Sequence, residues 1–186
     1  MSSVNFTQPT NGVWDCEHAT YLTARNAASS TVSTGSLYVG QWYWATAPTR
    51  YHIHRSVLIF DTSGLDDDAL IISATLKFRV NIDLSGTDFD VIVKSGAPTY
   101  PHNPVVDADY ALTNYSDNGG SKNTSDLVGD VNEVFNITLN YLGKSWINKT
   151  GDTKFALISS RDIGSDSPTG NEYIKICTPE DMDDCD

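Results

Sequence analysis

Short stretches in which apolar and polar residues alternate recur along most of the chain. Each stretch is rich in β-branched and aromatic residues and is bounded by Gly, Pro, Asn, Asp or Ser, a pattern typical of β-strands. The pattern predicts strands over residues 36–44, 52–61, 71–82, 88–94, 131–139, 154–160 and 172–177. We therefore expect an all-β protein.

Helical periodicity is confined to short segments. Residues 140–149 place Leu142, Trp146 and Ile147 on one side, which predicts a short amphipathic helix across one end of the fold. Residues 107–110 predict a single helical turn after a proline-rich bend. Residues 110–130 are rich in Ser, Asn, Gly and Asp, so we expect a long polar loop there.

Several short antiparallel strands bury their apolar faces best as two packed sheets. The predicted fold is an all-β, two-sheet antiparallel β-sandwich, jelly-roll-like, with one or two short helices, in a single domain over residues 1–186. The predicted core consists of alternate apolar residues of the strands: Leu58, Phe60, Leu76, Phe78, Val80, Val91, Val93, Phe135, Ile137, Phe155, Leu157, Ile174 and Ile176.

The charge of the chain narrows its expected partners. Its 24 acidic and 12 basic residues give a formal net charge of -12, which would repel a phosphate backbone, so we expect no nucleic-acid partner. No apolar run reaches the roughly 18 residues of a membrane span, so we expect no membrane insertion. The N-terminal residues also lack the basic and apolar regions of a secretory signal.

An excess of carboxylates suits Ca²⁺, which prefers oxygen ligands. The candidate ligands of a structural calcium ion are Asp107 and Asp109, beside the proline-rich bend, and Asp88 and Asp90. None of them has the spacing of an EF-hand loop, and the alternative is that the acidic surface serves solubility alone. His52 and His54 share one face of a strand, but the sequence shows no third metal ligand beside them.

The three cysteines, Cys16, Cys177 and Cys185, are too few and wrongly spaced for a zinc ribbon. Cys177 and Cys185 could close a small disulfide loop in an oxidising compartment, which would leave Cys16 as a buried thiol or an intermolecular link. The alternative is three unpaired thiols in a reducing compartment.

An aromatic cluster surrounds the turn between the first two predicted strands. Trp42, Tyr43, Trp44 and Tyr51, with the adjacent Arg50, form the predicted ligand-binding patch. Flat aromatic rings stack on the C–H surfaces of sugars and also anchor protein interfaces. The alternative is that Trp42 and Trp44 pack inward as core, which would leave Tyr43 and Tyr51 as the exposed pair.

Arg55 lies within an apolar run, where a charge is costly unless it is paired. We predict a structural role for Arg55, with Asp61, Asp88 or Asp90 as its partner. The chain has no Gly-x-Ser-x-Gly turn, and no two carboxylates are singled out as an acid–base pair. We therefore expect no enzymatic activity.

Two parts of the sequence resemble a known family. Residues 55–61 (RSVLIFD) and 72–78 (ISATLKF), joined by an acidic turn, are similar to the central hairpin of DNRLRE-type β-sandwich domains, which resemble carbohydrate-binding modules. Residues 142–148 and 154–162 resemble a later helix and strand, in the form carried by phage and environmental viral proteins. The resemblance covers roughly residues 12–178. Family domains usually end in a further strand, for which the residues after 178 show no match. We expect either a sheet edge open to a strand of another chain, or a sequence that ends before the closing strand.

The resemblance implies a non-enzymatic surface or structural protein of a virion or extracellular assembly, such as a decoration, fibre or adhesin component. Its partners would be other subunits of a homo- or hetero-assembly. The alternative is a carbohydrate-binding module of an extracellular polysaccharide-degrading system. A module for acidic glycans would need a basic patch, for which Arg50, Arg55, Lys77, Arg79 and Lys94 are the candidates.

Overall fold

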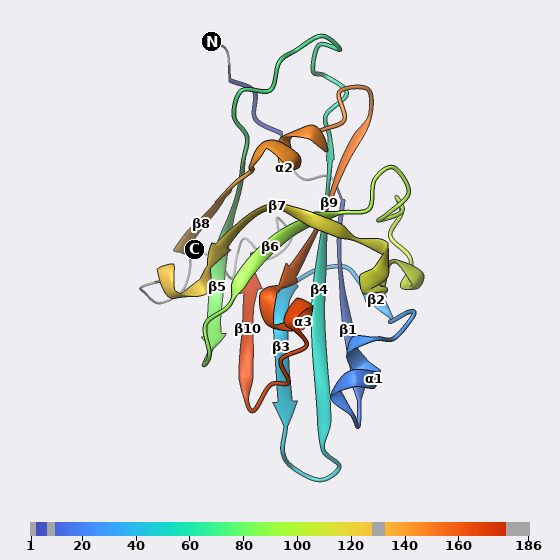
Figure 1. Ribbon diagram of the computed structural model, residues 1–186, viewed down its shortest axis with the longest axis vertical. Coiled ribbons are helices and arrows are strands. Elements are labelled where there is room, and N and C mark those ends of the chain that lie inside the picture. Colours follow the sequence, from blue (N-terminus) through green and yellow to red (C-terminus); the bar gives the residue numbers. More distant parts are fainter. Residues whose placement is uncertain (1–2, 7–9, 128–132, 178–186) are drawn as a thin grey trace.

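A computed structural model describes residues 3–6, 10–127 and 133–177. Within these residues the chain forms strands, short α-helices and 3₁₀ turns (Figure 1). The strands are β1 (Thr10–His18), β2 (Val32–Ser33), β3 (Leu37–Trp44), β4 (Arg50–Asp61), β5 (Thr75–Ser85), β6 (Asp90–Ser95), β7 (Ser116–Asn123), β8 (Glu133–Thr138), β9 (Asp152–Ser159) and β10 (Asn171–Ile176). The helices are α1 (Tyr21–Arg25), α2 (Tyr141–Ser145) and α3 (Ser160–Gly164), with 3₁₀ turns η1 (Asp107–Tyr110), η2 (Leu112–Asn114) and η3 (Thr124–Asp126).

The strands pair antiparallel in the order β7-β6-β9-β4-β3-β10-β5-β8, and β1 pairs with β4 and β2. The sheet curls until its two end strands approach each other. The backbone N–H of Asn140, just after β8, donates to the carbonyl oxygen of Gly119 in β7 at 2.9 Å. The fold is thus a nearly closed, barrel-like antiparallel sheet. The all-β prediction is confirmed, whereas the continuous pairing does not confirm a division into two jelly-roll sheets.

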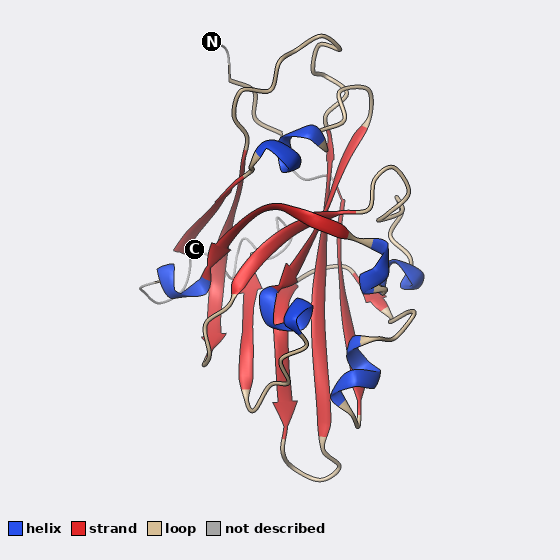
Figure 2. Ribbon diagram, in the orientation of Figure 1, coloured by secondary structure: helices blue, strands red, loops and turns tan. Residues whose placement is uncertain are grey.

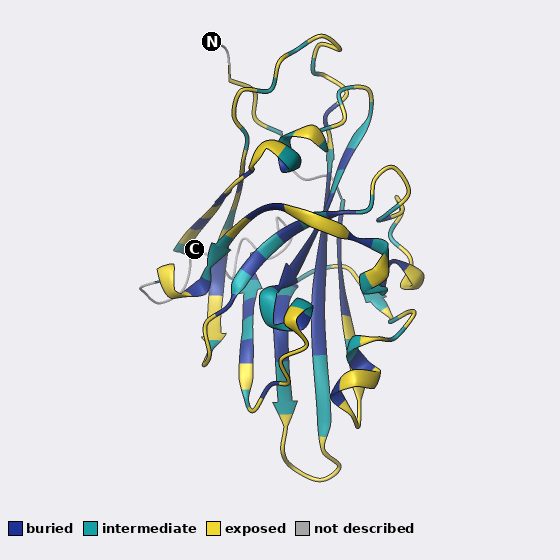
Figure 3. Cartoon of the chain, viewed as in Figure 1, coloured by how far each residue is buried: buried dark blue, intermediate teal, exposed yellow. Residues whose placement is uncertain are grey.

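The interior of the curled sheet holds the main hydrophobic cluster, seen as the buried central strands in Figure 3. Every residue predicted for the core belongs to it: Phe60 and Phe78 are partly buried against the cluster and the others are buried. A second cluster lies on the opposite face of β4, between β1, α1 and the η1 turn. Its fully buried members include Trp14, Ile53 and Tyr110.

The predicted strands correspond to β3, β4, β5, β6, β8, β9 and β10, and α2 and η1 lie where helical turns were expected. Two expectations are wrong. The predicted polar loop over residues 110–130 contains β7, and the β4–β5 hairpin implied by the family resemblance does not form, because β5 pairs with β10 and β8. The loop-like composition of β7 reflects close packing: Gly119 lies directly against Gly143 of α2, where a β-carbon would collide.

The molecule is elongated, and Figure 2 shows strands running along most of its length with short helices around them. The β3–β4 hairpin projects at one end of the long axis, and α2 lies toward the other end. No helix in the described residues is long and apolar enough to cross a membrane.

The cysteines differ in state. Cys16 is a free, partly buried thiol. Cys177 is disulfide-bonded, so the alternative of three unpaired thiols is wrong. The other cysteine of the predicted pair, Cys185, lies outside the described residues.

Candidate functional site

The β3–β4 hairpin separates the predicted ligand-binding patch into two faces. Its register pairs Trp42 with His52 and Tyr43 with Tyr51. Side chains of directly paired antiparallel residues lie on the same face, and successive residues alternate. Trp42, Trp44 and Arg50 therefore share one face, and Tyr43 and Tyr51 share the other.

The first of these faces carries a continuous set of rings from three adjacent strands. The ring of Trp42 stacks on His52 with centroids 4.0 Å apart and an interplanar angle of 16°, and Trp44 meets Trp42 edge-on at 5.6 Å. Farther along, His54 lies 5.3 Å from Tyr38 and 5.8 Å from Tyr173 of β10. We call this surface, formed by Tyr38, Trp42, Trp44, His52, His54 and Tyr173, the aromatic face.

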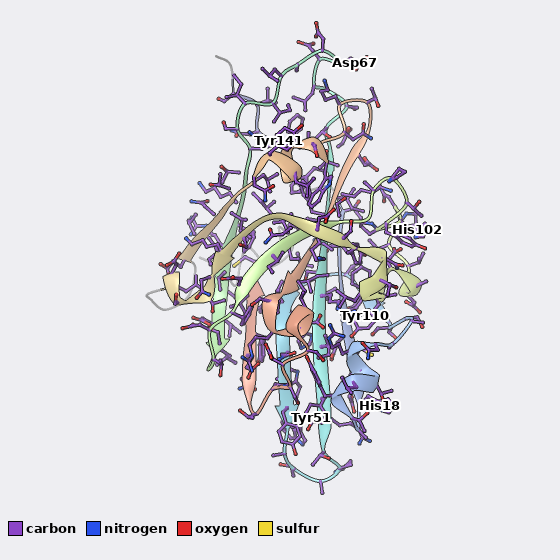
Figure 4. The ribbon with its side chains drawn as sticks, viewed as in Figure 1. His18, Tyr51, Asp67, His102, Tyr110 and Tyr141 are labelled. Atoms are coloured by element: carbon purple, nitrogen blue, oxygen red, sulfur yellow. The ribbon has the colours of Figure 1, made fainter. Side chains whose placement is uncertain are left out.

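The aromatic face is open to solvent near the hairpin. Trp44 is 49% exposed and Trp42 is half-buried, so the alternative in which both tryptophans pack into the core is wrong. On the other face, Tyr51 packs against the second cluster and lies 5.9 Å from Tyr21, while Tyr43 lies 4.8 Å from Tyr51. Tyr51 is labelled near the end of the hairpin in Figure 4.

Gly40 allows these strands to come together. It is paired with His54 on one side and Tyr173 on the other. Its φ of +128° lies in a region that residues with a β-carbon avoid, and a β-carbon would lie 2.1 Å from the carbonyl oxygen of Glu172. A glycine at this point therefore lets β10 approach β3 and brings the rings of His54 and Tyr173 into contact.

Carboxylates from β1 border the aromatic face. Asp15 is paired with His54, and its two oxygens lie 2.9 and 3.1 Å from Nδ1 of His52. Glu17 accepts a hydrogen bond from Nε of Arg50 at 2.7 Å. The charge of Arg50, the basic member of the predicted patch, is therefore balanced by Glu17.

His54 is a buried, neutral imidazole. Nε1 of Trp42 donates to Nε2 of His54 at 3.1 Å, so that nitrogen is an acceptor and the ring proton is on Nδ1. Burial lowers the pKa of His54 to about 4, with the nearby His52 lowering it further and Asp15 opposing the shift. Within the described residues Nδ1 of His54 has no hydrogen-bond partner, and Oδ1 of Asp15 lies 3.8 Å from it.

Arg55 belongs to the opposite face and has a different partner from those predicted. Its Nε and NH2 groups donate to the two carboxylate oxygens of Asp162 at 2.7 and 2.9 Å. Asp61 instead accepts from Ser63. The prediction failed because Asp162 lies in α3, more than a hundred positions along the chain, and only the pairing of β9 with β4 brings it near. The structural role predicted for Arg55 fits its full burial.

The aspartates predicted to bind calcium make hydrogen bonds in two separate places. Asp88 and Asp90 accept from Thr124 and Asn123, near β7. The other two lie in η1. Asp107 accepts a hydrogen bond from the backbone N–H of Val32, and the buried Asp109 accepts hydrogen bonds from the backbone N–H groups of His102 and Val106. Among the described residues, no three His, Cys, Asp or Glu side chains form a group that could hold a metal ion.

An open cavity of about 900 Å³ lies at the end of the barrel near α2. Its walls combine apolar residues, such as Leu65, Leu70 and Ile72, with polar ones. The hydroxyls of Thr62 and Thr153, which also line it, bond to each other at 2.6 Å, and Thr62 bonds to the carbonyl of Asn148 as well. The cavity thus offers apolar surface with these polar groups already satisfied, whereas the aromatic face retains an unpaired donor at His54.

Comparisons with known proteins add nothing to this geometry. No family model, curated protein or solved structure matches the chain. Nothing in these comparisons identifies a DNRLRE-type domain.

Several residues of the site were not predicted as binding residues. The shared face of His52 and His54 was visible from their spacing, and the same alternation places Tyr38 with Trp42. Asp15 and Tyr173 could not be added from the sequence, because they lie on strands whose partners no local pattern specifies.

Proposed function

We propose that the protein is a non-catalytic binding protein whose ligand is a carbohydrate and whose binding surface is the aromatic face. The observation that carries this proposal is the ring cluster on an open sheet face, in which Trp42 stacks on His52 and Trp44 meets Trp42 edge-on. Sugar rings present flat C–H surfaces that pack on aromatic rings. Asp15, at the edge of the stack, adds an acceptor for sugar hydroxyls.

The shape of the surface supports binding to a chain rather than catalysis. An extended polysaccharide fits an open strand face, along which rings can stack at successive points. Chemistry on a small substrate instead favours a concave site that excludes water.

Affinity electrophoresis through gels containing neutral polysaccharides tests the proposal. We expect at least one polysaccharide to retard the wild-type protein, and Trp44→Ala to remove the retardation. Tyr141→Ala is the matched control, since Tyr141 is an 84% exposed aromatic residue on α2, away from the β3–β4 hairpin (Figure 4). Retardation that survives Trp44→Ala, or is lost equally in Tyr141→Ala, would count against the aromatic face as the site.

Subunit association is a second candidate function, and two exposed apolar residues favour it. Leu84 of β5, 39% exposed, is paired with Tyr173, and Ile82, 38% exposed, is paired with Lys175. Both extend the surface of the aromatic face, which suits a protein partner. We propose on this basis a decoration, fibre or adhesin component of a virion or extracellular assembly. Sedimentation should show an oligomer that Leu84→Lys dissociates; a stable wild-type monomer over a wide concentration range would contradict it.

The finer features expected from the sequence are also proposals. One is a two-sheet jelly-roll sandwich of the DNRLRE type. It is supported by the single core to which two groups of strands contribute, namely β6 with β9, and β5 with β8 and β10.

A structural Ca²⁺ at Asp107 and Asp109, or at Asp88 and Asp90, is another proposal. Such an ion would raise the unfolding temperature on addition of calcium. An unchanged unfolding temperature with calcium or chelator would remove the ion from the proposal.

A further inference from the structure

Asp15 and His52 form a fixed polar pair beside the ring stack. An ionised carboxylate only accepts hydrogen bonds, so Nδ1 of His52 is the donor across the distances of 2.9 and 3.1 Å. The His52 ring is held in place by its stacking on Trp42. The Asp15 side chain is 47% exposed, so a ligand can reach this acceptor from solvent.

His54 is a second hydrogen-bond donor close to Asp15. Its Nδ1–H lacks a hydrogen-bond partner within the described residues, and Oδ1 of Asp15 is 3.8 Å away, just beyond bonding distance. A buried donor without an acceptor is unfavourable. Asp15 therefore lies between two imidazoles and bonds to only one of them.

We propose that Asp15, His52 and His54 form a subsite for a hydroxyl group of a neutral sugar, an inference that rests on the proposed carbohydrate function. The hydroxyl oxygen accepts a hydrogen bond from Nδ1–H of His52 and donates its own proton to the Asp15 carboxylate. Asp15 then turns its other oxygen to Nδ1–H of His54. The Nδ1–H groups of both histidines and the Asp15 carboxylate are then all hydrogen-bonded, whereas Nδ1–H of His54 lacks a partner in the free protein.

This exchange selects the chemical class of the ligand. A group inserted between His52 and Asp15 must both accept a hydrogen bond from His52 and donate one to Asp15. A hydroxyl can do both, whereas an ether or a carboxylate can only accept. A sugar carboxylate or sulfate is also repelled by Asp15. The basic patch considered for acidic glycans is not assembled here, because Arg55 is buried with Asp162 and Arg50 is paired with Glu17. The ligand class is thus a neutral glycan with free hydroxyls.

The experiment measures retardation of the folded wild-type chain in gels containing xyloglucan, galactomannan, laminarin, amylopectin or polygalacturonate. The neutral glycan that binds best is then compared with its O-methylated form. We expect Asp15→Asn to weaken binding to the neutral glycan at least tenfold and O-methylation to have a similar effect. Asp67→Asn is the control for the change in charge, since Asp67 is exposed and lies at the opposite end of the molecule (Figure 4).

The outcomes separate this subsite from the proposed function. Binding that Trp44→Ala removes and Asp15→Asn leaves at the wild-type level overturns the subsite and keeps the carbohydrate function. Stronger retardation by polygalacturonate than by every neutral glycan, or equal binding of the O-methylated form, also overturns the subsite. No retardation by any of the five polysaccharides overturns both proposals. Circular dichroism of each variant confirms that the fold is unchanged.

Discussion

The guanidinium of Arg55 is fully buried against the carboxylate of Asp162, which it contacts through two hydrogen bonds, and lies over the ring of Tyr110 at 4.1 Å from the ring centroid. Two further donors of Arg55 bond to the carbonyl oxygens of Tyr110 and Arg25. One side chain of β4 thus holds α1, α3 and the end of η1 in place. This attachment supports the hairpin from the face opposite the aromatic face.

Asp162→Asn should lower the free energy of unfolding by about 3–5 kcal/mol, because it leaves a buried guanidinium without a counter-charge. Denaturant unfolding at neutral pH measures the change. Arg50→Gln is the control: it removes the Arg50–Glu17 pair, which is partly exposed, and should cost less than about 1 kcal/mol. Similar losses in the two variants would show that the buried pair is not the stronger attachment.

Gly40→Ala should destabilise the protein more than Gly35→Ala, although both glycines have positive φ angles. At Gly35, with φ +116°, a β-carbon has open space around it, so the cost is that of the backbone conformation alone, about 1–2 kcal/mol. At Gly40 the β-carbon also collides with the backbone of β10. Thermal unfolding of both variants tests this difference, and an equal effect would contradict the close approach of β3 and β10.

The Cys16 thiol should be alkylated several-fold more slowly in the native protein than in urea. Burial raises the pKa of this thiol above its ordinary value, while hydrogen bonds with Tyr110 and Ser30 oppose the shift only partly. The thiolate is the reactive form, so a raised pKa lowers the reactive fraction at pH 8. Mass spectrometry after timed iodoacetamide treatment gives the rates. Equal rates in the native and unfolded protein would contradict the raised pKa.

The sequence predicted the core well because period-two alternation is a local signal. Leu58 and Phe60, or Ile174 and Ile176, show their common face within a few residues. The same signal grouped His52 with His54. It misled at β7, where glycines needed for close packing against α2 resemble those of a loop.

The parts of the site that the sequence did not predict depend on contacts between segments far apart in the chain. The partner of Arg55 and the carboxylate beside His52 both come from segments whose position depends on strand order, namely α3 after β9, and β1. A single sequence carries no pattern that specifies which strands are neighbours. The residues of the predicted aromatic patch therefore lie on two different faces of the hairpin, and the patch did not include Asp15 and Tyr173.

Stability should rise with pH between about 4 and 6.5 because of His54. Its pKa is about 4 in the folded protein, against an ordinary value of 6.5, so the unfolded chain binds the additional proton throughout this window. At about 1.4 kcal/mol for each pKa unit, the contribution of His54 is on the order of 3 kcal/mol, fully present above pH 6.5 and lost as the pH falls toward 4. Its neighbours Asp15 and His52 shift the pKa in opposite directions, and burial dominates.

His54→Gln isolates this contribution, since the glutamine amide can still accept the hydrogen bond from Trp42 and does not titrate. The free energy of unfolding, measured in urea at intervals between pH 4 and 8, should fall less steeply toward acid in His54→Gln than in the wild type. His18→Gln, at an exposed histidine, serves as the control and should follow the wild-type curve. Parallel curves for wild type and His54→Gln would mean that His54 is not held neutral by burial in the folded protein, and Nε2 of His54 could then not accept the hydrogen bond from Trp42.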